Sequence, residues 1–248
     1  MISKARLKYI HSLDLKKNRK ADGVFVAEGP KLIEDLIRVF EPTYICATKE
    51  WLLQHPNITA DEVTEEELCR ASFQEHPQQV LAIFRQPKDT VNPKEVIKNN
   101  LCIALDDVQN PGNLGTIVRL ADWFGIEHIF CSPGCADLYN PKVVQSTMGG
   151  LARVKVHYCN LPELIASLPE GTPIYGTFLD GEDMYEKHLE QHGLIVMGNE
   201  GKGVSAEVGK LVTERLYIPN YPKDRETSES LNVAIATAVI CAEFRRRG

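Results

Sequence analysis

The sequence predicts an α/β protein built around a parallel β-sheet, with a smaller α/β domain in front of it. Two continuous apolar runs, residues 101–105 and 193–198, are typical of parallel strands that helices cover on both faces. Between such runs, apolar residues recur at helical spacing, as at Leu114, Ile117 and Val118. The second run leads directly into a glycine-rich turn, and open α/β sheets bind ligands at this end of their strands.

The first 85 residues carry a short α/β pattern of their own. Pro30 and Thr64 mark the starts of two helices, one by its fixed φ and one as a cap. Runs rich in β-branched and aromatic residues predict strands at residues 23–27, 43–47 and 79–84. Apolar positions at helical spacing or capping signals predict helices at residues 4–13, 30–40, 51–53 and 65–72.

Residues 86–93 interrupt this pattern, because they are polar, contain two prolines and show no periodicity. Such a composition is typical of a linker between domains. We therefore divide the chain into an N-terminal domain at residues 1–85, a linker at 86–98 and a second domain at 99–248.

The second domain alternates strands and helices. Strands are expected at residues 101–105, 127–131, 154–158, 173–178, 193–198 and 216–219. Helices are expected from residue 113, at residues 140–148 and from residue 230. Asn113 is expected to cap the helix that carries Arg119, and residues 177–181 are expected to leave the sheet as a loop.

Composition excludes several classes of protein. The 248 residues are 43% hydrophobic and 25% charged, as in an ordinary globular protein, and no apolar run has the length of a membrane span. The N-terminus does not resemble a signal peptide. Seven cysteines without a C-x-x-C pair indicate reduced thiols, hence a cytoplasmic protein. Cys131 and Cys135 lie near His128, but their spacing does not match a zinc site, so no metal is predicted.

Charge is distributed unevenly along the chain. The net charge is −6, yet the first 20 residues contain seven basic residues and one acidic residue. A basic face on an acidic protein can dock a polyanion such as RNA. A solvated helix surface explains the same pattern equally well, so charge alone leaves both interpretations open.

The glycine-rich turn carries the candidate ligand site. Its glycines, at 198, 201 and 203, follow the spacing G-x-x-G-x-G. This spacing differs from the dinucleotide fingerprint, and Lys202 is not followed by the Ser or Thr of a phosphate loop. Glycine lets the main chain approach a ligand closely, so we expect a small ligand held largely by backbone groups.

Three motifs stand at the ends of predicted strands. They read Asn-Leu-Gly-Thr-Ile-Val-Arg at 113–119, Met-Gly-Asn-Glu-Gly-Lys-Gly-Val-Ser at 197–205, and Ile-Pro at 218–219 with Ser-Leu-Asn-Val at 230–233. In this order they resemble the SpoU (TrmH) family of RNA 2′-O-ribose methyltransferases, in the SPOUT superfamily, from residue 101 to the C-terminus. The N-terminal part, through Phe25, Glu28, Gly29 and Lys31, resembles the small ribosomal-protein-like RNA-binding domain of many members.

The resemblance implies a fold, a cofactor and partners. It implies a trefoil-knotted parallel-sheet domain, S-adenosylmethionine as cofactor, RNA as substrate, and a homodimer packed through the knot and the C-terminal helix. Carried over by position, the implied cofactor-binding residues are Gly198, Ile218, Leu231, Thr177, Leu179, Asn199, Gly201 and Asn220. The implied catalytic residues are Arg119, Asn113, Glu200, Ser230 and Asn232. Arg119 would act as a base or, as we favour, as a fixed positive charge.

One segment departs from the family pattern. Asn220 stands where members commonly have Met, and residues 221–229 form a longer loop without glycine. In this loop Lys223 and Arg225 either contact RNA phosphate or belong to a solvated surface. Both interpretations remain open.

Alternative functions also remain. Ribosomal RNA is favoured as the substrate over transfer RNA, on family analogy alone. A non-catalytic RNA-binding assembly factor is a second alternative, although Arg119, Glu200, Ser230 and Asn232 are all present. A Rossmann-type enzyme for a small molecule is a third, and the absence of a glycine-rich turn after the first strand of either domain argues against it.

Overall fold

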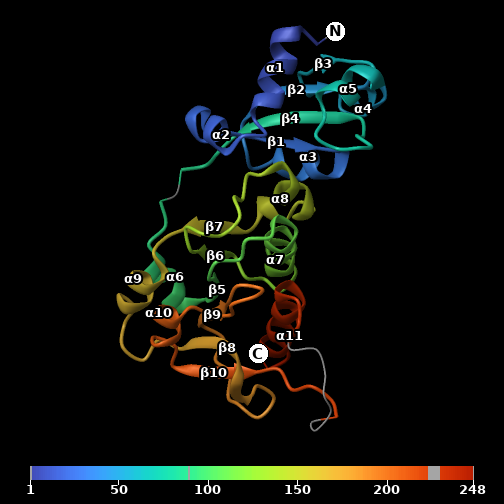
Figure 1. The fold of residues 1–248 in the computed structure, drawn as a ribbon. Helices are drawn as coiled ribbons and strands as arrows, with labels where there is room; N and C mark the ends of the chain where they lie inside the picture. Colours follow the sequence, from blue (N-terminus) through green and yellow to red (C-terminus); the bar gives the residue numbers. More distant parts are fainter. Residues whose placement is uncertain (1, 89, 223–229, 248) are drawn as a thin grey trace. The chain divides into compact units, whose positions relative to one another are not determined.

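The computed structural model describes residues 2–88, 90–222 and 230–247. The chain forms two compact units (Figure 1). One consists of Met1–Lys88 with Asp137–Ala152, and the other of Asp89–Ala136 with Arg153–Gly248. Lys223 and Arg225, for which RNA contact and a solvated surface both remain open, fall outside the described residues.

The N-terminal unit is built on a four-stranded sheet of order β1-β4-β2-β3. Its strands are β1 (Val24–Glu28), β2 (Pro42–Ala47), β3 (Asp61–Glu62) and β4 (Val80–Arg85). Strand β4 pairs antiparallel with β1 and β2, and β3 pairs parallel with β2. The helices are α1 (Lys4–Ser12), α2 (Lys16–Asp22), α3 (Pro30–Leu36), α4 (Lys49–Gln54) and α5 (Glu65–Ala71). The predicted strands and helices of this region are confirmed, and α2 and β3 were not predicted.

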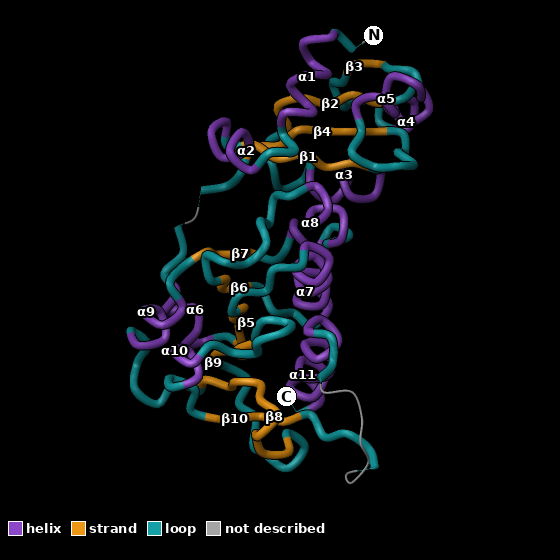
Figure 2. Tube along the Cα trace, viewed as in Figure 1, coloured by secondary structure: helices purple, strands orange, loops and turns teal. Residues whose placement is uncertain are grey.

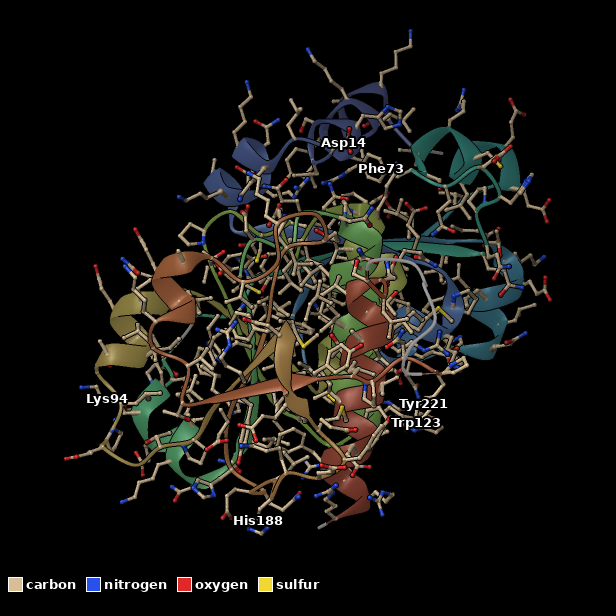
Figure 3. The ribbon with its side chains drawn as sticks, turned by 60° about the horizontal axis from the view of Figure 1, so that its bottom comes forward. Asp14, Phe73, Lys94, Trp123, His188 and Tyr221 are labelled. Carbon is tan, nitrogen blue, oxygen red and sulfur yellow. The ribbon has the colours of Figure 1, made fainter. Side chains whose placement is uncertain are left out.

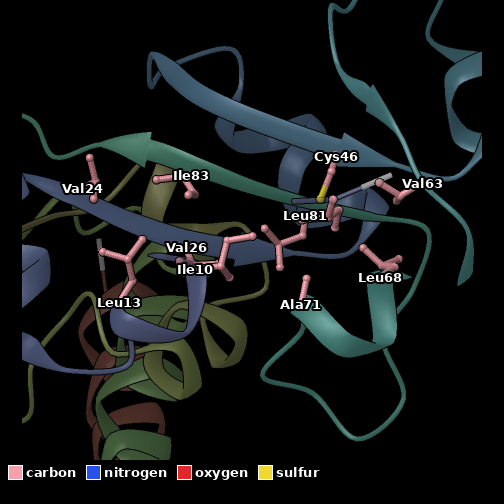
Figure 4. Packing of buried hydrophobic residues seen from close by; sticks show 11 residues of the cluster. Ile10, Leu13, Val24, Val26, Cys46, Val63, Leu68, Ala71, Leu81 and Ile83 are labelled. Atoms are coloured by element: carbon pink, nitrogen blue, oxygen red, sulfur yellow. The ribbon is translucent and has the colours of Figure 1, made fainter. Parts of the chain in front are cut away.

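One face of this sheet holds a hydrophobic core (Figure 4). Ile10 and Leu13, at the end of α1, pack with Leu68 and Ala71 of α5 against the sheet residues. Helix α5 is fixed by a capping box, in which Thr64 accepts from Glu67 N and the Glu67 carboxylate accepts from Thr64 N. The predicted cap at Thr64 is therefore confirmed.

Residues 137–152 belong to the N-terminal unit, although they lie far along the chain. They contain α8 (Pro141–Ser146) and the short helix η1 (Gly150–Ala152). Arg19, which is 2% exposed, pairs with Asp137 at 2.6 Å, and the ring of Tyr139 stacks on Phe25 with centroids 4.9 Å apart. Sequence periodicity locates an element along the chain but does not reveal which sheet it packs against, so a contiguous division misses this excursion.

The second unit is built on a six-stranded sheet of order β10-β8-β9-β5-β6-β7, in which every pair is parallel. The strands are β5 (Leu101–Leu105), β6 (His128–Cys131), β7 (Lys155–Tyr158), β8 (Ile174–Asp183), β9 (Gly193–Met197) and β10 (Glu214–Tyr217). The central strands β5 and β9 are buried along their whole length, as their continuous apolar sequence predicts. The predicted α/β class with a parallel sheet is confirmed.

Helices cover both faces of this sheet (Figure 2). On one side lie α6 (Pro93–Asn99), α9 (Leu161–Ala166) and α10 (Ala206–Gly209), and on the other α7 (Pro111–Trp123) and α11 (Val233–Arg246). Helix α6 begins within the predicted linker at 86–98 and ends one residue after it, and its Ile97 is fully buried in the core with Cys102 and Leu194. The second half of that stretch is thus part of the second unit.

Two local predictions are wrong. Asn110, not Asn113, caps α7: its Oδ1 accepts from Gly112 N at 2.8 Å and Asn113 N at 3.1 Å, because Pro111 begins the helix. Residues 177–181 do not leave the sheet, because β8 continues to Asp183 beside β10 after a bulge. Only a glycine fits at 181, where a Cβ would lie 2.6 Å from the Leu216 carbonyl carbon. Among the described residues, no helix is long and apolar enough to cross a membrane.

Candidate functional site

A cavity of 700 Å³ lies in the second unit, at the carboxyl ends of β9 and β10 and beside the middle of β8. This size is within the usual range for small-molecule and cofactor sites. Segments far apart in sequence line it: residues 177–179, 197–204, 216–221, 230–231, 233 and 236. Because parallel strands end at the same edge of a sheet, the loops that follow them converge there.

Main-chain packing shapes the floor of this cavity. A Cβ at Gly198 would lie 2.2 Å from the Gly203 carbonyl carbon and from Val204 N, so only glycine fits. The turn closes through two backbone hydrogen bonds of 2.9 Å between Asn199 and Gly203. Gly203 itself has φ +69, in the left-handed region that favours glycine. The glycine spacing noted in the sequence therefore encodes a backbone turn that side chains could not form.

The Asn199 side chain holds this turn in place. Its Nδ2 donates to Asp107 O at 2.7 Å, and its Oδ1 accepts from Gly201 N at 2.9 Å and Lys202 N at 3.0 Å. These contacts tie the turn after β9 to the loop after β5. Asn199 lines the cavity, but its amide is engaged within the protein, so it shapes the site more than it presents a free polar group.

A hydrogen-bonded network joins the three sequence motifs beside the cavity. Asn113 Nδ2 donates to Glu200 Oε1 at 2.9 Å, and Asn232 Nδ2 donates to Asn113 Oδ1 at 3.1 Å. The Oδ1 of Asn232 also caps α11, accepting from Ala234 N at 3.0 Å. Residues 113, 200 and 232 thus meet although up to 119 positions separate them.

Burial raises the pKa of Glu200, but hydrogen bonds from Asn113 and from nearby backbone N–H groups outweigh it. The net result is a pKa below the ordinary value for glutamate, so the carboxylate is ionised at neutral pH. A carboxylate of lowered pKa is a poor proton acceptor. Its geometry suits it to orienting Asn113 and, through it, Asn232.

All eight predicted cofactor-binding residues line the cavity, namely Gly198, Ile218, Leu231, Thr177, Leu179, Asn199, Gly201 and Asn220. Glu200 and Ser230 line it as well. Asn220 accepts a hydrogen bond from the Tyr217 hydroxyl at 2.7 Å, so the residue that departs from the family pattern has a defined place in the wall.

Arg119 is placed differently from the other predicted residues. It is exposed on α7 and is not among the residues that line the cavity. Within the described part of the chain it has no hydrogen-bond or ion-pair partner. The alternative pair with Asp122 is not formed, because Arg153 makes two hydrogen bonds to that carboxylate, of 2.7 and 2.8 Å.

Sequence reasoning missed one aromatic wall. Phe178 lines the cavity, and the guanidinium of Arg215 lies 3.5 Å from its ring centroid. Arg215 also pairs with Asp180 at 2.5 Å. Alternation of side chains between the two faces of β8 and β10 could have indicated that Phe178 and Arg215 stack. The register shift between Arg215 and Leu216 breaks that alternation, so the sequence does not reveal the contact. Among the described residues, no group of three or more His, Cys, Asp or Glu side chains could hold a metal ion.

The fold and this cavity define a class of α/β protein that holds a ligand against glycine-rich main chain at the carboxyl edge of a parallel sheet. Residues 100–242 match the SpoU rRNA Methylase family, and residues 4–82 match the MRM3-like substrate binding domain. The chain belongs to the SpoU rRNA methylase family.

Curated and solved relatives agree with this placement. The chain is 30% identical, over 94% of its length and 93% of the relative's, to the 23S rRNA (guanosine(2553)-2′-O)-methyltransferase RlmP of Bacillus subtilis. A putative RNA methyltransferase of the TrmH family from Porphyromonas gingivalis has 39% identity and a TM-score of 0.89, with both chains fully covered. An AdoMet-bound rRNA methyltransferase from Sinorhizobium meliloti has 27% identity and a TM-score of 0.85, covering 100% of this chain and 97% of that one.

Proposed function

We propose that this protein transfers a methyl group from S-adenosylmethionine to a ribose 2′-hydroxyl of ribosomal RNA. The observation that carries the proposal is the convergence of Asn113, Glu200 and Asn232 beside a cavity lined by Gly198 and Leu231. Similarity to rRNA 2′-O-methyltransferases supports ribosomal RNA over transfer RNA as the substrate. A cytosolic location fits such a substrate.

The cavity fits the cofactor. At Gly198 the backbone packs against Gly203 and Val204, so main-chain groups of this turn line the cavity, as a ligand held by backbone requires. We assign cofactor binding to Gly198, Ile218 and Leu231, with Thr177, Leu179, Asn199, Gly201 and Asn220 completing the walls. When bound, S-adenosylmethionine supplies an electrophilic methyl group on a positively charged sulfur.

The protein's own residues then act on the acceptor. Ser230 and the second Nδ2–H of Asn232, just before α11, offer hydrogen bonds that fix the ribose for in-line attack, and Glu200 orients Asn113. Arg119 supplies a fixed positive charge that favours negative charge developing on the 2′-oxygen. We assign it this electrostatic role because a guanidinium is protonated at any physiological pH.

Arg119 reaches a cavity through a homodimer. Trp123 is four residues along α7 from Arg119, so both side chains lie on the same face of the helix. The Trp123 ring, labelled in Figure 3, is 84% exposed, and Ile235 on the adjoining α11 is 54% exposed. A tryptophan this exposed beside a charged residue on one helix face is a candidate contact for a second copy, because indole is enriched at protein interfaces. A second copy packed over α7 and α11 would meet Arg119 together with Trp123.

The family's trefoil knot is part of the proposal. Strand β10 pairs with β8 and not with the preceding β9, and the chain then returns to α11, which packs against α7. These connections are consistent with a C-terminal segment that passes through an earlier loop, the exception to unknotted topology that this family represents.

The N-terminal domain predicted at residues 1–85, with which residues 137–152 pack, is proposed to dock the RNA. The predicted linker at 86–98 joins it to the methyltransferase domain predicted at 99–248, although α6 at the end of that linker packs in the second unit. Support comes from six exposed cations on α1 and α2, namely Lys4, Arg6, Lys8, Lys16, Lys17 and Lys20. Arg19 does not contribute, because its guanidinium is buried against Asp137 and the backbone of Leu13 and Asp14.

Methyl transfer from tritiated S-adenosylmethionine to rRNA and to transfer RNA tests the proposal directly. Mass spectrometry of the labelled RNA would then locate the 2′-O-methyl group. Transfer to rRNA supports the proposal, transfer only to transfer RNA changes its substrate, and RNA binding without transfer would leave the assembly-factor alternative.

A further inference from the structure

A second cavity lies wholly within the N-terminal unit, and nothing in the proposed function uses it. Its volume is 390 Å³. It forms where the starts of α3 and α4, the side of α5 and the turn before β4 come together. We call it the N-terminal pocket. Its polar lining includes Glu50, Glu65, Gln78 and Gln79, and its apolar walls include Pro30, Leu68 and Pro77.

Two of the polar side chains that line this pocket are carboxylates, Glu50 and Glu65, and they stand beside amides that both donate and accept. Glu50 and Glu65 are exposed, and within the described residues neither carboxylate has a hydrogen bond or ion pair. An ionised carboxylate can only accept hydrogen bonds. A ligand that meets the two carboxylates therefore presents N–H donors, and their negative charge disfavours a phosphate group.

A metal ion does not satisfy these requirements. Although Cys69 also lines the pocket, no group of three ligating His, Cys, Asp or Glu side chains occurs anywhere in the described part of the chain. Apolar walls beside acceptors favour a flat group with polar edges. Unpaired bases of RNA are recognised in this way, by stacking on flat or apolar side chains and by hydrogen bonds to their edges.

The back of the pocket is rigidly built. Thr48 is 7% exposed, and its backbone N–H donates to Gln79 O at 2.7 Å. Gln79 has φ +49, and Val80 N donates to Gln78 O at 2.5 Å across it, which forms a tight three-residue turn. A residue with a Cβ adopts this conformation only where its surroundings hold it, and such residues cluster at ligand sites.

We infer that the N-terminal pocket receives one unpaired RNA base that carries an exocyclic amino group, which is adenine, cytosine or guanine. The inference rests on the proposed function, because it requires RNA as the substrate. The amino group donates to Glu65 and Glu50 between the walls of Pro30 and Pro77. The sugar-phosphate chain stays outside, beside the exposed Lys31 and Lys49, which adjoin the lining residues Pro30 and Glu50. The pocket thereby selects which RNA segment the N-terminal unit docks.

Replacing Glu65 tests this assignment against a matched control on the same helix. Glu66 shares the first turn of α5 and is exposed, but it does not line the pocket. Glu65→Ala removes the acceptor and is expected to raise the Kd for an unmodified rRNA transcript about tenfold, since a carboxylate that accepts from a base amino group discriminates by roughly that factor. Glu66→Ala leaves the Kd unchanged or lowers it, because removing a negative charge favours a polyanion.

The direction in which the Kd for RNA changes in the two variants tells a base-binding pocket from a simple effect of charge. If the pocket holds no base, both substitutions remove one negative charge and should behave alike, and equal affinities would overturn the inference. Affinity for S-adenosylmethionine and kcat at saturating RNA are expected to stay at the wild-type level in both variants. Failure of the proposed function is separate, because it would appear as absence of methyl transfer by the wild-type protein.

Cys69 gives a second readout that needs no substitution. Its thiol is exposed and lines the pocket. A base in the pocket would cover this thiol. Alkylation of Cys69 by N-ethylmaleimide is therefore expected to slow at least severalfold when the rRNA transcript is bound, as measured by peptide mass spectrometry. Unchanged alkylation at saturating RNA would contradict the inference. Cys159, which is partly exposed in the other unit, provides the internal reference.

Discussion

The two units of this protein prepare their binding surfaces in opposite ways. The cavity at the parallel sheet is formed by backbone: Gly198 touches the turn at Gly203 and Val204, and the Asn199 amide is engaged with Asp107 O. The N-terminal unit presents side chains instead, with Glu50 and Glu65 at its pocket and Lys16 and its neighbours on α2.

This difference has a physical consequence. Backbone contacts fix the shape of the cavity before the cofactor binds. Binding a cofactor that is always the same molecule then costs little conformational entropy of the protein. Exposed side chains tolerate substitution and displacement, which suits an RNA whose recognition depends on charge and on a few bases. We therefore expect substitutions to separate the two functions cleanly, and each prediction below tests that separation.

The largest expected effect is that of Arg119→Ala on methyl transfer. Loss of one preorganised positive group at a developing negative charge lowers kcat by about 10²- to 10³-fold. The affinity for S-adenosylmethionine should not change, because Arg119 does not line the cavity, and the fold should not change, because the side chain is exposed. Single-turnover transfer and calorimetric titration measure the two quantities.

Arg153→Ala is the matched control, because it removes an exposed arginine that pairs with Asp122 on the same helix. Mixing Arg119→Ala with Gly198→Ala tests the dimer. If a second copy brings Arg119 to the cavity, a mixed dimer contains one intact site, formed by the cavity of the Arg119→Ala copy and Arg119 of the Gly198→Ala copy. Activity then returns in part.

Wild-type kcat in the Arg119→Ala variant would exclude this residue from the mechanism.

The next largest effect is that of Gly198→Ala on cofactor binding. The new Cβ would meet backbone of Gly203 and Val204 at 2.2 Å, and backbone cannot turn aside as a side chain can. Forced overpacking of this kind costs about 1–3 kcal/mol, which corresponds to roughly 5- to 150-fold weaker binding of S-adenosylmethionine. RNA affinity should remain near the wild-type value if the two units act separately.

Gly201→Ala provides the control within the same turn. Its Cβ would find only Asn199 Oδ1 within 4 Å, at 3.8 Å, and Gly201 is not among the glycines of positive φ. Cofactor affinity should therefore change little. Equal losses at 198 and 201 would show that the turn responds to any added methyl group, and that close packing at Gly198 is not the cause.

Periodicity and strand-end turns predicted where a ligand site could form, but the resemblance to the family named its residues. Gly198, Glu200 and Asn232 follow or precede apolar runs, and the structure brings them together, while their roles stay predictions. The contact that Asn113 makes could not be found from the sequence. In a turn that contains both Asn110 and Asn113, either residue could cap the helix, and the structure shows that Asn110 does so while Asn113 binds Glu200. Nothing in the sequence indicated that residues 137–152 pack with the N-terminal unit, because that packing depends on long-range contacts such as Arg19–Asp137.

A smaller effect is expected when cations of the N-terminal unit are neutralised. Lys16, Lys17 and Lys20 are exposed on α2. If they bind RNA phosphates, replacing all three with Gln lowers the slope of log affinity against log salt by about 0.7 for each phosphate that is no longer neutralised. Binding of S-adenosylmethionine should not change. Replacing the exposed Lys94 and Lys98 of α6, in the other unit, is the control for removal of positive charge, and an equal change in slope there would contradict a local docking surface.

The smallest effect concerns the pH dependence of the Asn113–Glu200–Asn232 network. The pKa of Glu200 is lowered in the folded protein, so its ionised form stabilises the fold above the usual glutamate pKa of 4.5. That stabilisation is lost as the pH falls through the lowered value. Glu200→Gln should therefore be slightly less stable than wild type at neutral pH, and the difference should disappear in acid. Urea unfolding across this range measures it, with Glu207→Gln, an exposed carboxylate of α10, as control. A difference that persists unchanged in acid would mean that shape, and not the charge of Glu200, holds Asn113 in place.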